Sequence, residues 1–93
     1  MRPKIQAPDA ETLALQALAF LAADDDRLSQ FLTLTGLDIA QLRGLARDPS
    51  ALGLVLDYLL NWEPLLLEFA TAQEIAPEIV MQVRRRLPGA TDY

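Results

Sequence analysis

Residues 48–60, DPSALGLVLDYLL, are the stretch of the sequence that decides the fold. An aspartate begins it, and Pro49 fits the first position of a helix, where the missing backbone N–H leaves no hydrogen bond unmade. Every residue from 51 to 60 is apolar or glycine except Asp57. A helix that is apolar nearly all round must be covered by other elements, so the pattern predicts a central helix over residues 49–60.

The rest of the chain shows the marks of further short helices, with a capping residue or a proline at each start and apolar residues at helical spacing. These predicted helices cover residues 10–23, 27–35, 39–46, 63–72 and 77–87. Asp38 with Gln41 three residues later is the pattern of a capping box, and Gly36 suits the left-handed residue that ends a helix. Because the links are short, we expect an all-α fold, a compact bundle of five or six short helices.

The length of 93 residues leaves room for one domain. Residues 1–8 contain two prolines and little periodicity, and we predict a flexible N-terminal tail there. We assign residues 9–89 to a single helical domain and residues 90–93 to a C-terminal tail. Charged residues interrupt each apolar run well before the roughly 18–20 apolar residues that a membrane span needs, so we expect no span.

The composition argues against several kinds of functional site. The chain has no Cys and no His, which removes thiolate chemistry, disulfides, the commonest general base and the commonest transition-metal ligand. It also holds no glycine-rich phosphate loop and no calcium-loop pattern. We therefore expect no cofactor, no bound metal and no enzymatic activity. The missing cysteines fit a reducing compartment, and we expect the protein to be cytoplasmic.

Asp57 is the one polar residue in the central helix, and a buried carboxylate there could act as an acid or a base. However, Asp57 shares a helical stripe with Gly53 and Asn61. We therefore expect its side chain to face solvent or to cap the start of the next helix.

Charge is distributed unevenly along this chain of net charge −5. Between residues 48 and 78 the chain has several acids and no Lys or Arg. Nucleic-acid binders need an extended basic face, so we do not expect nucleic acid to be the partner. The alternative is weak DNA binding through Phe31–Arg47, which has the outline of a helix-turn-helix with Gly36 in its turn.

Arg84, Arg85 and Arg86 lie near the end of the last predicted helix. Cations in this position complement the helix dipole and can bond the last carbonyl groups, and we favour that interpretation. The alternative is that these arginines form a docking patch for an acidic partner or for the acidic middle segment of another copy.

Apolar residues are more numerous in the predicted helices 49–60 and 63–72 than a small bundle can easily cover. Exposed apolar patches usually mark interfaces, and Trp and Tyr are enriched at their energetic centres. The candidate interface consists of Tyr58, Trp62, Leu66 and Phe69. Packing of Trp62 as core over the corner between these two helices is an equally good interpretation. The function hypothesis is an interaction or adaptor module, with an unknown protein partner or with a second copy in a homodimer.

Several short segments look like parts of a known family: LALQALAFLA (13–22), TGL (35–37), DP (48–49) followed by LDYLL (56–60), and LPG (87–89). They resemble the bacterial domain-of-unknown-function family numbered 3572, over about residues 11–89. The resemblance implies a small intracellular helical protein, found mainly in alphaproteobacteria. It carries no assigned activity, cofactor or functional residue, so it supports the fold and leaves the function open.

Overall fold

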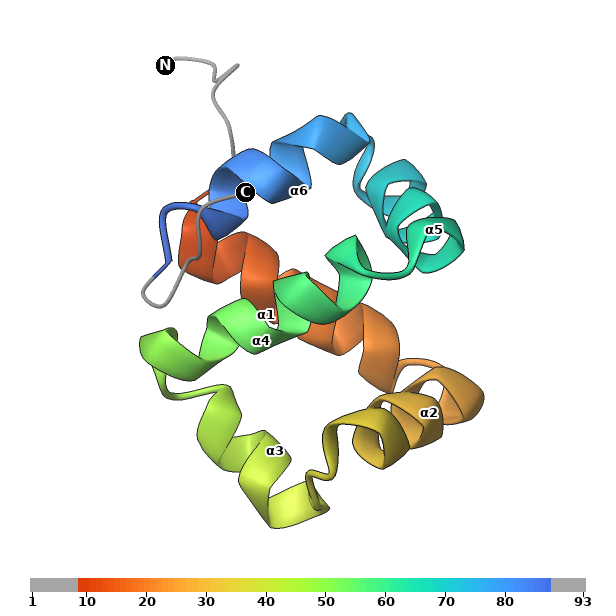
Figure 1. Cartoon of the computed structure of the whole chain (residues 1–93), viewed down its shortest axis with the longest axis vertical. Coiled ribbons are helices and arrows are strands. Elements are labelled where there is room, and N and C mark those ends of the chain that lie inside the picture. The colour runs from red at the N-terminus through yellow and green to blue at the C-terminus, as the bar shows by residue number, and fades with distance from the viewer. Residues whose placement is uncertain (1–8, 88–93) are drawn as a thin grey trace.

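The computed structural model describes residues 9–87, and all regular secondary structure in this range is helical. The helices are α1 (Ala10–Ala22), α2 (Asp25–Thr35), α3 (Ile39–Leu45), α4 (Pro49–Leu60), α5 (Glu63–Gln73) and α6 (Pro77–Arg84). Figure 1 shows α4 crossing α1, with α2 and α3 toward one end of the molecule and α5 and α6 toward the other. The predicted all-α bundle of five or six short helices is confirmed. The predicted tails, residues 1–8 and 90–93, lie outside the described residues.

The central position of α4 follows from its sequence. The helix packs against α1, α3, α5 and α6. Its buried side chains Leu52, Val55, Leu56 and Leu59 meet a matching apolar face of α1 that includes Leu21. Burial of one such side chain contributes roughly 1.5–3 kcal/mol, so the crossing of α1 and α4 is a substantial source of apolar stabilisation.

Three aspartates fix helix starts as the sequence predicts. The Asp9 carboxylate accepts a hydrogen bond from the Thr12 amide at 3.1 Å, and the Asp24 carboxylate accepts two from amides in the first turn of α2. At α3 the capping box is complete, because Asp38 Oδ1 accepts from the Gln41 amide at 2.8 Å and Gln41 Oε1 accepts from the Asp38 amide at 2.9 Å. These bonds satisfy amides that have no partner inside the helix.

Two helix boundaries differ from the prediction by more than one residue. Helix α2 begins at Asp25 rather than near residue 27, because Asp24 alone supplies the cap and the next two aspartates occupy the first turn. Helix α6 ends at Arg84 rather than at Leu87. Beyond it the Leu87 amide donates to the Arg84 carbonyl at 3.1 Å, which is the tighter three-residue spacing of a turn. No helix within residues 9–87 has both the length and the apolar character needed to cross a bilayer.

Gly36 ends α2 in the left-handed conformation, with φ of 77°, and an added Cβ would meet no atom within 4 Å. We expect Gly36→Ala to destabilise the fold by about 1–2 kcal/mol, because only the backbone conformation opposes the substitution. Gly44→Ala, inside α3 and equally free of contacts, should stabilise the fold by up to about 1 kcal/mol. Urea unfolding measures both changes. Midpoint shifts of the same sign would contradict this explanation.

Candidate functional site

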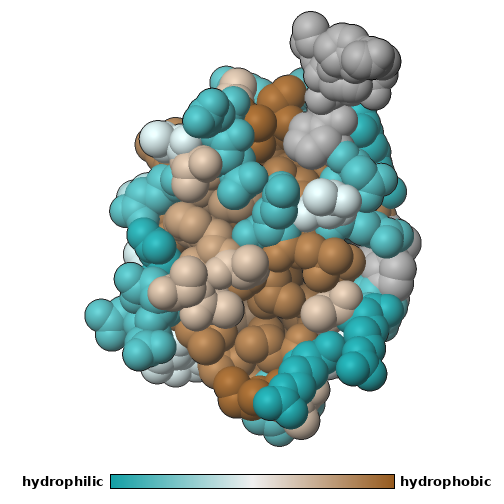
Figure 2. Space-filling view, turned by 180° about the vertical axis from the view of Figure 1, so that it is seen from behind, coloured by the Kyte–Doolittle hydropathy of each residue, from teal (hydrophilic) through white to brown (hydrophobic). Residues whose placement is uncertain are grey.

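Large apolar side chains remain exposed on every helix and at one helix start: Leu15, Leu34, Ile39, Leu54, Trp62, Leu67 and Met81. Figure 2 shows the molecule from behind, the side on which α1 lies, and apolar residues cover much of the centre of that face. Exposed apolar surface alone does not define a site. Places where such side chains border a concave surface are stronger candidates.

One such place is a hollow of about 360 Å³ between α2 and the C-terminal end of α4. Its lining consists of Gln30, Leu34, Tyr58, Asn61 and Trp62, and we call it the α2–α4 groove. None of these side chains is charged. Leu34 is 66% exposed and Trp62 is 37% exposed, so two large apolar side chains stand open to solvent beside the hollow.

A row of aromatic rings connects the α2–α4 groove to the core. The ring of Tyr58 meets the fully buried ring of Phe31 edge-on, with 4.9 Å between centroids. Trp62 meets Tyr58 edge-on at 6.3 Å. Edge-to-face pairs of this kind contribute beyond their buried area, so the core holds the wall of the groove in place.

The hydroxyl group of Tyr58 is buried and has no hydrogen-bond partner among the described residues. Leaving a buried polar group without a partner costs roughly 1–3 kcal/mol. Burial also raises the pKa of Tyr58, because the charged phenolate loses its hydration there. The sequence carries no signal for this buried hydroxyl group, since its burial results from packing between α2 and α4.

A second hollow, of about 530 Å³, lies where α1, α2 and α5 meet. Here Arg27 pairs with Glu68 at 2.5 Å, and the guanidinium carbon lies 4.4 Å from the centroid of the Phe20 ring. An exposed pair of this kind contributes less than about 1 kcal/mol. The contacts join the start of α2 to α5, which gives these charged residues a structural role.

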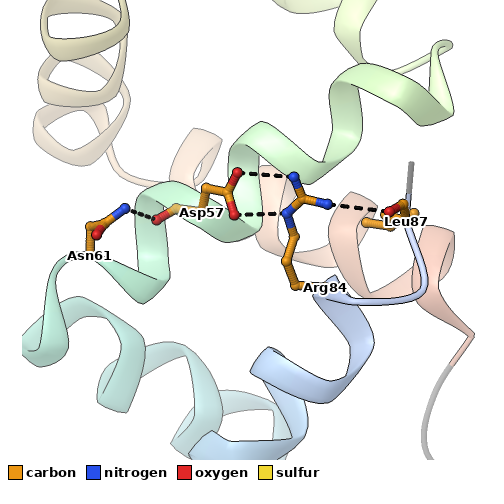
Figure 3. Close-up of polar contacts among 4 residues, drawn as sticks. All are labelled: Asp57, Asn61, Arg84 and Leu87. Atoms are coloured by element: carbon orange, nitrogen blue, oxygen red, sulfur yellow. Dashed lines mark hydrogen bonds and ion pairs between the residues drawn. The ribbon is translucent and has the colours of Figure 1, made fainter. Parts of the chain in front are cut away.

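Asp57 is only partly exposed to solvent, because its carboxylate pairs with Arg84 of α6 (Figure 3). Arg84 Nε donates to Asp57 Oδ1 at 2.7 Å and Arg84 Nη2 donates to Asp57 Oδ2 at 3.0 Å. Arg84 Nη1 lies 3.4 Å from the Leu87 carbonyl oxygen, to which it donates. The sequence-based expectation missed the partner of Asp57, because helical spacing places a residue on a face but does not show which neighbour covers that face.

The guanidinium of Arg84 lies directly against Gly53, one turn before Asp57 in α4. A Cβ atom at Gly53 would be 2.5 Å from Arg84 Cζ. A Cβ atom at this position would therefore force the guanidinium of Arg84 to move from its place between α4 and α6. Gly53, Asp57 and Arg84 form one structural unit, in which a buried cation is neutralised by a carboxylate that is partly open to water.

The structure separates the residues of the predicted candidate interface. Tyr58 and Trp62 line the α2–α4 groove, and Leu66 is partly buried against the core. Phe69 is fully buried with its ring 5.4 Å from that of Phe20, so it is a core residue that offers no surface to a partner in this structure. Sequence reasoning missed Leu34, although one signal was present: it is an apolar residue outside the inward stripe of α2.

The predicted docking patch also needs correction. Arg84 is only 4% exposed, because its pairing with Asp57 draws the side chain between α4 and α6. Arg85 and Arg86 are exposed, and their role in docking stays a prediction. In the Phe31–Arg47 segment, the Gln41 side chain is engaged in the capping box. DNA binding through that segment also stays a prediction.

Comparison with protein families identifies a matching model over residues 7–90, described as Protein of unknown function (DUF3572). The chain belongs to this family. The resemblance found in the sequence is thereby confirmed, and the DUF3572 match spans all the described helices, the α2–α4 groove and the Asp57–Arg84 pair. No curated protein and no solved structure matched the chain significantly. Within residues 9–87, no three acidic side chains come together in a group that could hold a metal ion.

The close approach at Gly53 predicts a reversal of sign. In the wild-type background we expect Gly53→Ala to destabilise the protein by about 2 kcal/mol, because the new Cβ displaces the guanidinium from its charge-assisted hydrogen bonds. In an Arg84→Ala background the same substitution should stabilise by about 0.5–1 kcal/mol, since only the higher helix propensity of alanine remains. Urea unfolding of the four proteins provides the measurement. Equal effects in both backgrounds would refute the proposed contact.

Burial of the Tyr58 hydroxyl predicts its titration. In a Tyr93→Phe variant, Tyr58 is the remaining tyrosine, and we expect its pKa in the folded protein to lie above the ordinary value of 10.0. As pH rises, the unfolded chain then releases this proton before the folded protein does. The contribution of Tyr58 to the free energy of unfolding should therefore be fully present below pH 10 and be lost above it. Ultraviolet absorbance of tyrosinate measures the pKa, with the urea-unfolded variant as control. A folded value at or below the unfolded one would show that the hydroxyl is not desolvated.

Proposed function

We propose that this chain is a cytoplasmic protein–protein interaction module without catalytic activity, and that it contacts its partner through the α2–α4 groove. The observation that carries the proposal is the exposure of Leu34 and Trp62 beside an uncharged hollow. Apolar side chains exposed around a concave surface are typical of interfaces.

The residue types and their support favour protein recognition. Trp and Tyr dominate binding energies when they sit in rigid, well-packed positions, because they offer a large contact area for few rotatable bonds. The ring of Phe31 supports Tyr58, and the ring of Tyr58 in turn supports Trp62. The amide side chains of Gln30 and Asn61 at the same site provide polar groups that can orient a partner.

The groove also suits an apolar anchor of a partner better than a charged metabolite. No charged side chain lines it, so nothing there would neutralise a phosphate or a carboxylate. A cavity of about 150 Å³ already accommodates a benzene-sized apolar group, and the groove is larger. One leucine or aromatic side chain from a partner's helix would fit this description.

Site-specific photo-crosslinking tests the proposal in the native cell. A photoreactive amino acid replaces Gln30, which lines the groove. As the control, it replaces Met81 on α6, whose exposed fraction is close to that of Trp62 and which lies apart from α2 (Figure 1). We expect covalent protein adducts from position 30 and none from position 81, because only the former faces the proposed interface. Mass spectrometry identifies the adducts.

The same experiment includes matched neutral substitutions. Leu34→Gln should reduce the crosslinking yield at position 30 by roughly tenfold or more, since loss of an interface anchor typically costs above about 1.4 kcal/mol. Met81→Gln should leave the yield unchanged. Absence of adducts at position 30, or equal reduction by both substitutions, would refute the groove as the interface.

A further inference from the structure

We propose that the occupant of the α2–α4 groove is a second copy of this chain, related to the first by a two-fold axis, with Leu34 of each copy inserted into the groove of the other. The inference rests on the proposed function and names its partner. The shape of the groove, its charge and its polar groups favour this occupant.

The shape is self-complementary. The same small surface carries a protruding apolar side chain, Leu34 at 66% exposure, and a hollow of about 360 Å³ beside it. A two-fold axis brings a surface against the same surface of the other copy. A surface with both a protruding side chain and a hollow can therefore place each protruding side chain in the hollow of the other copy. The arrangement would cover Leu34 and Trp62, the two exposed apolar side chains at this site.

The charge distribution favours the same arrangement. The chain carries a net charge of −5, so two copies repel each other over most orientations. Residues 28–37, LSQFLTLTGL, contain no charge, and the lining of the groove contains none. By contrast, Arg27 and Glu68 lie in the hollow between α1, α2 and α5. A two-fold contact centred on Leu34 therefore brings together uncharged lining residues from both copies.

The polar groups at the site agree with a symmetric contact. Gln30 lies one helical turn before Leu34 on α2, and Asn61 lies beside Trp62. An amide side chain carries both donors and acceptors, so the same residue from two copies can pair across a two-fold axis. The five residues that line the α2–α4 groove form only a small interface. We therefore expect association to be weak and dependent on concentration.

Sedimentation velocity over about 5–500 μM tests the inference on the full chain, which has a mass of 10.3 kDa as a monomer. We expect the wild-type mass to rise toward that of a dimer. Leu34→Asp and Leu34→Arg should each weaken association at least about tenfold, because equal charges meet across the axis. An equimolar mixture of the two variants should restore association, since opposite charges then face each other.

Met81→Asp serves as the control, because it adds the same charge to another exposed apolar position on α6 and should leave association unchanged. Circular dichroism establishes that each variant is folded. A wild-type chain that stays monomeric throughout, variants at Leu34 that associate normally, or a mixture that fails to recover would each overturn the inference. A monomeric chain that still forms adducts from position 30 with another protein would overturn only the second-copy partner and support the proposed function.

Discussion

The burial of α4 is the constraint on which the other helices depend. Between Ala51 and Leu60 the helix offers water almost no polar surface, so its sides have to be covered by protein. Four buried residues of this helix together contribute about 10 kcal/mol of gross apolar stabilisation, which is comparable to the whole net stability of a small domain. The short links then determine which neighbours are available, and α1, α3, α5 and α6 share the task.

The cover is incomplete at the C-terminal end of α4, and the candidate site lies there. Helix α2 reaches this end through Phe31, whose buried ring supports Tyr58. Beyond that contact the two helices leave the α2–α4 groove, with Leu34 and Trp62 exposed beside it. The site is thus the place where a rigid aromatic core reaches the surface. An interface built on it would require little reorganisation on binding.

The single acidic residue of α4 has a different consequence. Asp57 neutralises Arg84 between α4 and α6, and Gly53 provides the space for the guanidinium. Such a pair contributes little net energy compared with apolar packing. Removing one partner is nevertheless strongly destabilising, because it leaves the other charge buried and uncompensated. It fixes how α6 approaches the central helix. It also removes one arginine from the run at residues 84–86, leaving only Arg85 and Arg86 exposed.

The sequence by itself determined the secondary structure and its main boundaries, because helix starts depend on local chemistry. Asp9, Asp38 and Gly36 act within a few residues of their own positions, so their caps were predictable. The central position of α4 was also predictable from its apolar pattern. Family membership followed from short segments spread along the whole chain.

Only the tertiary structure decided which surface residues lie together. Leu34 and Trp62 are 28 positions apart and meet at one hollow because α2 packs beside the end of α4. Phe69 and Arg84 were expected at the surface and are buried, since other helices cover them. Helical spacing specifies the direction of a side chain relative to its own helix axis. The contacts of that side chain depend on how distant helices pack, which no local pattern contains.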